Sequence, residues 1–187
     1  MTPDAEIPNR LTGWSTAGPD WDTVYAEQLP RVYNYFRYRT GNEADAEDLT
    51  SRTFEKAWRA RQRYRRDIAG FGTWILRIAR NVAVDHLRSI RDFASLDEAE
   101  QTQAEGTPEE HHARQSDGAR LAALLRELPE RERELLALKY GAGATNRAIA
   151  QLTGLSESNV GTILHRTVQA LRGRWDEPAP IDGLAPE

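Results

Sequence analysis

The chain has 187 residues, of which 29% are charged and 39% hydrophobic, with a formal net charge of −4 and no cysteine. The missing cysteine excludes disulfides, thiolate metal sites and a cysteine nucleophile, and the modest hydrophobic content favours small helical units. No apolar run approaches the roughly 20 residues needed to cross a bilayer, and residues 1–10 lack signal-peptide features, so we expect a cytoplasmic protein without membrane insertion.

The charge is distributed unevenly along the chain. Residues 21–91 carry 14 basic and nine acidic side chains, and residues 120–175 carry nine basic and five acidic ones, so their net charges are +5 and +4. The segment between them, 92–119, has a net charge of −7 and few apolar side chains. We therefore predict two basic domains joined by a flexible acidic linker, with disordered tails at 1–20 and 176–187.

The first basic domain is predicted to be helical. Apolar side chains recur every three or four residues in stretches that begin near Tyr25, Ala46 and Trp74, which is the spacing of a buried helix face. The opposite face of the third stretch carries four arginines and one acid between residues 77 and 91. A solvated surface and a polyanion-binding surface both fit such a face.

The second basic domain has the pattern of a helix-turn-helix. Thr145 can cap the first of its two helices, Ala150 is small enough for the helix crossing, and Gly154 tolerates a positive φ in the turn. Val160 supplies a β-branched plug, and Ser156 can cap the second helix. An ordinary helical hairpin would show the same apolar spacing, so both interpretations stay open.

The outer face of that second helix is polar. Asn159, Thr162 and Arg166 lie on it at helical spacing. In a DNA major groove these side chains can bond adenine, contact the thymine methyl group and bond guanine, respectively.

Two signatures resemble a known family. The first domain contains Ala46-Glu47-Asp48-Leu49-Thr50, then Thr53-Phe54 and Trp74-Ile75-Leu76-Arg77-Ile78-Ala79-Arg80-Asn81. The second contains Leu128-Pro129-Glu130-Arg131-Glu132-Arg133 before the helix-turn-helix. In this order they resemble the bacterial RNA polymerase sigma factors of the sigma-70 family, in the extracytoplasmic-function group. The resemblance implies an all-α protein of two small domains, a region 2-like helical bundle and a region 4-like helix-turn-helix.

The resemblance also implies that the protein binds core RNA polymerase and directs it to promoter DNA. The second helix would dock on the clamp helices of the largest polymerase subunit through Asp48, Leu49, Thr53, Phe54, Lys56 and Arg59. The third helix and the loop before it would hold the melted −10 strand through Phe71, Arg77, Arg80, Asn81 and Arg88. The second domain would bind the −35 duplex through Arg147, Ser158, Asn159, Thr162, His165 and Arg166.

Two positions depart from the family pattern. Ser51-Arg52 stands where relatives often have Gln-Glu, and Gly161 stands where many have a basic residue, so individual contacts could differ from theirs. An anti-sigma factor is expected as a further partner. The acidic linker is interpreted either as a mimic of nucleic acid inside the polymerase or as a solvated spacer.

Three other classes of protein fit the sequence less well. An enzyme would need a phosphate-binding loop, a nucleophile motif or a metal cluster, and we find none, so we expect no catalytic residue, metal or cofactor. A helix-turn-helix regulator that binds duplex DNA without polymerase has no use for residues 44–91. A helical adaptor that does not contact DNA would tolerate the loss of Arg77 and Asn81.

Overall fold

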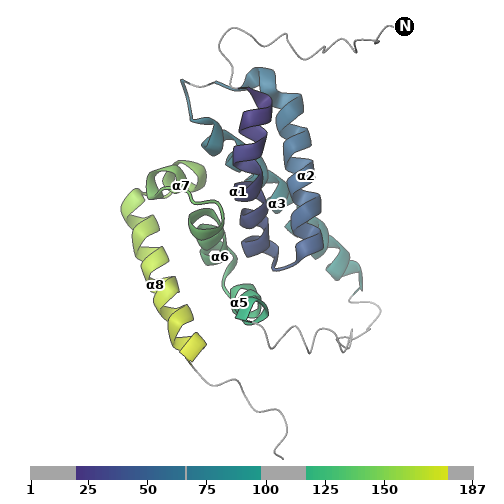
Figure 1. Cartoon of the computed structure of the whole chain (residues 1–187). Coiled ribbons are helices and arrows are strands. Elements are labelled where there is room, and N and C mark those ends of the chain that lie inside the picture. The colour runs from purple at the N-terminus through teal and green to yellow at the C-terminus, as the bar shows by residue number, and fades with distance from the viewer. Residues whose placement is uncertain (1–19, 66, 98–116, 177–187) are drawn as a thin grey trace, which may run out of the picture.

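A computed structural model describes residues 20–65, 67–97 and 117–176, and every regular element within these residues is helical (Figure 1). The prediction of an all-α fold is confirmed. The first domain comprises α1 (Trp21–Thr40), α2 (Glu43–Ala60), the short 3-10 turn η2 (Arg61–Arg63) and α3 (Phe71–Asp97). The second comprises α5 (Asp117–Arg126), α6 (Glu130–Leu136), the π-helical segment η3 (Ala137–Gly141), α7 (Asn146–Thr153) and α8 (Glu157–Asp176).

The turn between α7 and α8 follows from local sequence. The Thr145 hydroxyl accepts a hydrogen bond from the Ala148 backbone N–H at the start of α7, over 3.2 Å. The Ser156 hydroxyl accepts one from the Asn159 backbone N–H at the start of α8, also over 3.2 Å. Gly154 ends α7 in the left-handed region, with φ at 77°. The predicted caps and turn residue of the helix-turn-helix are thus confirmed.

The domain boundaries differ from those predicted. Helix α3 continues to Asp97, and α5 begins at Asp117, so both domains extend into the segment assigned to the linker. Neither glycine nor proline occurs in residues 92–97, so nothing in the local sequence stops α3 at 91. The rest of the linker and the tails lie outside the described residues, and the predictions made for them remain predictions: 98–116, 1–19 and 177–187.

The two domains share one hydrophobic core. Helix α1 lies between α2 and α3 on one side and η3 with α6 on the other (Figure 1). Tyr35 and Phe36 of α1 are fully buried, as are Leu135 of α6 and Leu138 of η3, and all belong to one continuous cluster. The sequence pattern predicted two separate bodies, whereas the structure packs them into one.

Among the described residues, no helix is both long enough and apolar enough to cross a bilayer.

The turn residue Gly154 gives a testable prediction. Because an L-residue in the left-handed region costs about 1–2 kcal/mol, Gly154→Ala should lower the free energy of unfolding by about that amount. Nothing lies within 4 Å of a Cβ added at residue 154, so the loss would come from backbone strain alone. Urea unfolding measures it.

The matched control for this substitution is Gly173→Ala in α8. A Cβ added there also meets nothing within 4 Å. Alanine is the better helix former by about 1 kcal/mol, so this control should leave stability unchanged or raise it. Equal stabilities for the two variants would contradict the left-handed turn.

Candidate nucleic-acid interface

Helix α8 turns a polar face to solvent. Its inner face buries Val160, Ile163 and Leu164 against the rest of the second domain, which leaves the opposite face exposed. Asn159 is exposed at the beginning of that face. A shallow hollow runs along it and is lined by Ser158, Gly161, Thr162, His165, Arg166 and Gln169. The structure therefore brings four of the five predicted −35 residues of α8 together along one hollow, while Asn159 is exposed one position after Ser158.

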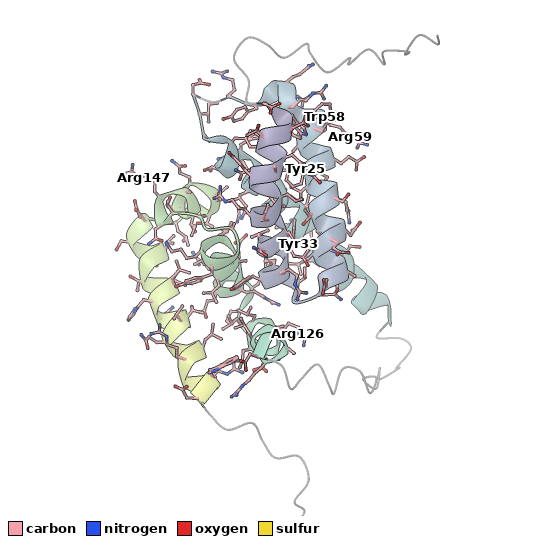
Figure 2. The ribbon with its side chains drawn as sticks, in the orientation of Figure 1. Tyr25, Tyr33, Trp58, Arg59, Arg126 and Arg147 are labelled. Carbon is pink, nitrogen blue, oxygen red and sulfur yellow. The ribbon has the colours of Figure 1, made fainter. Side chains whose placement is uncertain are left out.

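Arg147 lies beside this surface. It sits at the start of α7, and its Nε is 3.8 Å from a carboxylate oxygen of Glu157 in the first turn of α8 (Figure 2). Both side chains are exposed, and an exposed pair at that distance contributes little free energy. The guanidinium is therefore accessible to a phosphate that approaches the N-terminal end of α8.

The departure at Gly161 leaves space in the middle of the hollow. A Cβ added there would meet only Asn146, whose amide nitrogen would lie 3.6 Å away in ordinary contact. The glycine thus adds no side chain to the hollow on α8.

A second polar surface runs along α3. Arg77, Asn81 and Arg88 are all exposed, and their spacing of four and seven residues puts them on one side of the helix. Asp85 is also exposed, and its carboxylate is 3.3 Å from the ammonium of Lys56 on α2. The cationic character of this side is therefore carried by the two arginines, with the Asn81 amide between them.

Arg80 is placed differently from its neighbours on α3. Its Nε donates to a carboxylate oxygen of Glu134 on α6 over 2.7 Å, and its Nη1 donates to the Leu152 carbonyl of α7, also over 2.7 Å. In this structure the guanidinium is engaged by the second domain, so Arg80 does not share the open surface of Arg77, Asn81 and Arg88.

An aromatic cluster covers the beginning of α3. Phe71 is half-buried in it and packs edge-on against Trp21 and Tyr64, at ring-centroid distances of 6.0 and 5.2 Å. Trp74 also belongs to this cluster, and its ring centroid lies 5.1 Å from that of Phe71. Phe71 is therefore mainly a packing residue, and the ring offered to solvent is Trp58, which is 37% exposed and packs 5.1 Å from Trp21.

Trp58 stands next to a basic segment that the sequence reasoning did not assign to the site. The guanidinium of Arg61 lies 3.9 Å above the Trp58 ring, and Arg63 and Arg65 follow, both exposed. Arg65 forms an ion pair with Asp67 and holds the pKa of that carboxyl below its usual value. An exposed ring bordered by cations is the arrangement that binds single-stranded nucleic acid. In the sequence, the basic run Arg61-Gln62-Arg63-Tyr64-Arg65-Arg66 is the feature that could have identified this segment.

A third surface lies between α1 and α2. It is a groove of about 380 Å³ with a largely apolar floor. The rings of Tyr25 and Phe54 pack 4.6 Å apart within it, and both labelled tyrosines, Tyr25 and Tyr33, lie along α1 (Figure 2). The groove is lined by Tyr25, Leu29, Pro30, Tyr33, Glu47, Thr50, Ser51 and Phe54.

Comparison with known proteins assigns both domains to one family. The sigma-70 region 2 model matches residues 24–92, and the sigma-70 region 4 model matches residues 118–171. The chain belongs to the sigma-70 family. We call α1 to α3 the region 2 domain and α5 to α8 the region 4 domain.

Several curated relatives similar to this sigma-70 protein are named as extracytoplasmic-function (ECF) sigma factors. The ECF sigma factor BldN of Streptomyces coelicolor is 32% identical over 79% of this chain and 57% of its own length. SigE of Mycolicibacterium smegmatis is 33% identical over 86% of this chain and 63% of its own length. SigL of Mycobacterium tuberculosis is 29% identical over 80% of this chain and 85% of its own length. The chain thus spans less than two thirds of BldN and of SigE.

Solved structures agree on the fold. The sigma factor RpoE of Bartonella quintana, in complex with the anti-sigma factor NepR, has a TM-score of 0.69 at 18% identity and covers 84% of this chain and 99% of its own. CnrH, in complex with the cytosolic domain of CnrY, has a TM-score of 0.63 at 24% identity and covers 85% of this chain and 89% of its own. At such identities the likeness establishes the fold alone.

The residues predicted to bind polymerase divide into surface and core positions. Asp48, Lys56 and Arg59 are exposed on α2, whereas Leu49 and Thr53 are fully buried. The Thr53 hydroxyl is satisfied inside the core, because it donates to the backbone carbonyl of Leu49. The structure thus places Leu49 and Thr53 in the core of the region 2 domain, and the exposed candidates for a polymerase contact on α2 are Asp48, Lys56 and Arg59.

Phe54 occupies an intermediate position. It is 7% exposed, and the exposed part of its ring lines the groove between α1 and α2. The groove adds Tyr25, Leu29 and Tyr33 of α1 to this candidate surface, and the sequence reasoning, which considered only α2, missed them.

Proposed function

We propose that this chain is a transcription initiation factor, which binds core RNA polymerase and directs it to promoters through a duplex −35 element and a melted −10 element. The observation that carries the proposal is the presence, in one chain, of two sigma domains that expose two chemically different polar surfaces. The polar face of α8 suits a duplex, while the α3 face with the nearby Trp58 suits a single strand.

The −35 surface is proposed to enter a major groove. Asn159, Thr162 and Arg166 would contact base edges, and each well-formed base contact contributes about 1–3 kcal/mol of discrimination. Ser158, His165 and Arg147 would contact phosphates, which set the register of α8 without reading sequence. Gly161 offers no cation there, so fewer side chains would carry the specificity.

The −10 surface is proposed to hold an unpaired strand. Extruding a base from a duplex costs a few kcal/mol, which stacking and hydrogen bonds in a pocket can offset. Asn81 has both a donor and an acceptor for a base edge, and Arg77 and Arg88 flank it as phosphate ligands. Trp58 and Arg61 would supply a stacking surface near the beginning of α3, where the strand would enter.

The α1–α2 surface is proposed to dock on the clamp helices of the largest polymerase subunit. Its apolar groove suits the apolar side of a helix, and the exposed charges of Asp48, Lys56 and Arg59 would surround the contact. An anti-sigma factor is proposed as a second partner for the same domains, because relatives of this fold have been solved in such complexes.

A helix-turn-helix regulator that works without polymerase would use only the α8 surface. That role leaves the α3 face and the α1–α2 groove without a purpose. Reconstitution with core polymerase separates the two: an initiation factor gives start-site-specific transcripts and binds duplex DNA weakly alone, whereas a regulator binds duplex DNA tightly and yields no transcripts.

Asn81→Ala tests the −10 assignment. Loss of one base contact of about 1–3 kcal/mol should reduce open-complex formation by the reconstituted holoenzyme by about 5- to 150-fold and relax the preference at one −10 base. Permanganate footprinting of unpaired thymines measures the opening. Ser89→Ala is the control, since Ser89 is exposed on α3 roughly 80° around the helix from Asn81. Unchanged opening and preference in Asn81→Ala would overturn the assignment.

Arg166→Ala tests the −35 assignment, with Arg172→Ala as the matched arginine control. Both side chains are exposed on α8, but Arg172 is turned roughly 120° away from Arg166. Arg166→Ala should weaken promoter binding by the holoenzyme about 5- to 150-fold and broaden the sequence selected at one −35 position. Selection from a randomised −35 library measures both effects. Equal losses for the two variants, without a change of preference, would mean that Arg166 contributes only charge.

A further inference from the structure

A carboxylate and a guanidinium form a pair at the N-terminal edge of the α8 surface. The Nε of Arg147 lies 3.8 Å from a carboxylate oxygen of Glu157, and the two side chains are 81% and 57% exposed. The region 2 arginines Arg31, Arg39 and Arg80, by contrast, donate hydrogen bonds to the region 4 domain and are engaged by protein groups. The pair of Arg147 and Glu157 therefore lies open to solvent beside the surface proposed for duplex DNA.

We propose that Glu157 is a specificity-determining residue of the −35 surface, which accepts a hydrogen bond from the amino group of a cytosine, and that Arg147 positions its carboxylate. This role of Glu157 rests on the proposed function and adds to it one base that the duplex surface selects. None of the side chains predicted to bind the −35 element is a carboxylate, so Glu157 would contribute a contact that they do not supply.

Glu157 occupies the first position of α8, at the end that meets DNA in this motif. In a helix-turn-helix, the N-terminal residues of the second helix contact base edges in the major groove. Ser158, the next residue, lines the hollow on α8, and so does Gly161, about one turn further along. Glu157 is turned only roughly 40° from Gly161 around the helix axis. Its carboxylate can therefore reach a base at the beginning of the hollow.

The start of α7 is held against the same part of α8. A Cβ added at Gly161 would lie 3.6 Å from the amide nitrogen of Asn146, the residue before Arg147. The Thr145 hydroxyl accepts a hydrogen bond from the Ala148 backbone N–H, which fixes the backbone around Arg147. Because the 3.8 Å contact with the carboxylate is longer than a hydrogen bond, the guanidinium keeps its N–H donors for a phosphate.

The glycine at 161 leaves this carboxylate to α7. A glutamate and a cation four residues later attract each other on a helix surface, but Gly161 carries no charge. Among the described residues, the cation paired with Glu157 is Arg147. The carboxylate is therefore held from the α7 side of the surface and is not drawn along α8 toward the middle of the hollow.

The chemistry of a carboxylate favours cytosine among the four bases. An ionised carboxylate only accepts hydrogen bonds. In the major groove, cytosine presents the N4 amino donor, whereas guanine presents the N7 and O6 acceptors and thymine the O4 acceptor. Adenine presents its N6 amino donor beside the N7 acceptor, which would repel the second carboxylate oxygen. Glu157 would therefore bind cytosine and oppose guanine and thymine.

The phosphates of DNA explain why the carboxylate needs Arg147. A duplex carries one negative charge per roughly 1.7 Å of its axis, so a lone carboxylate is repelled from the groove. The guanidinium of Arg147 offsets this repulsion from 3.8 Å away. A glutamate in the first turn also stabilises a helix through the helix dipole. That second role does not depend on the DNA sequence, so measurements on different bases separate the two roles.

Glu157→Gln is the test, because the amide keeps the size of the side chain, loses its charge and pairs with adenine. From a library with a randomised −35 element, the wild-type holoenzyme should select cytosine at one position by about 5- to 150-fold over thymine. The Glu157→Gln holoenzyme should select adenine there, and Glu157→Ala should lose the preference. The control is Glu127→Gln, since Glu127 is 59% exposed in the region 4 domain and also paired with an arginine, Arg174. The control should select the wild-type sequence.

The sign of the affinity changes separates base recognition from helix stabilisation. On four promoters that differ only at the selected position, Glu157→Gln should weaken holoenzyme binding to the cytosine promoter. It should strengthen binding to the guanine and thymine promoters, because the repulsion from their acceptors is removed. An equal loss on all four promoters, with a lower melting temperature by circular dichroism, would mean that Glu157 only stabilises α8 and would overturn the base contact.

Arg147→Gln tests the positioning role. Loss of a phosphate contact alone would weaken binding to all four promoters by the same factor. Loss of positioning should in addition lower the preference for cytosine, and Glu157→Gln should then have a smaller effect in the Arg147→Gln background than in the wild type. A uniform loss of affinity with an intact preference for cytosine would overturn the positioning role.

The assignment of Glu157 and the proposed function fail through different observations. A wild-type holoenzyme that initiates transcription but selects no cytosine in the −35 element would overturn the assignment of Glu157. A chain that does not direct core polymerase to any start site would instead contradict the proposed function.

Discussion

Helix α1 is buried on two opposite sides, and the arrangement of both domains depends on this. Tyr35 and Phe36 are fully enclosed, with α2 and α3 packed on one side and η3 on the other. An amphipathic helix at the edge of a domain needs one apolar stripe, whereas α1 carries apolar and arginine side chains that serve two partners. Removing the region 4 domain would expose part of this surface to water.

The two proposed DNA surfaces stand in different relations to that contact. Helix α8 lies at the edge of the molecule, away from α1 (Figure 1), and its polar face is exposed while the two domains are packed together. The face of α3 borders the contact, and there Arg80 is drawn into it while Arg77, Asn81 and Arg88 stay exposed. The interface between the domains therefore changes the charge presented along α3 but leaves the α8 face as it is.

The helix-turn-helix shows what local sequence can predict. Thr145, Gly154 and Ser156 act through hydrogen bonds and backbone angles within three residues of themselves, and the sequence predicts the role of all three. The exposed face of α8 followed from the same periodicity. By contrast, Leu49 and Thr53 lie in a motif that suggested a docking surface, although their spacing is equally that of a buried stripe. Periodicity places a residue on a face but does not state which face meets solvent.

The sequence by itself determined the all-helical fold, the two sigma domains and the polar outer face of α8, because each depends on periodicity, caps and motifs within a short stretch of chain. Only the tertiary structure decided that the domains share a core, that Arg80 is bound by Glu134, and that Gly141 lies against the backbone of α1. These contacts join residues far apart in the chain, between 54 and 111 positions for the arginine hydrogen bonds. No local pattern encodes such pairings, since they arise from the complementarity of two surfaces whose residues lie far apart in the chain.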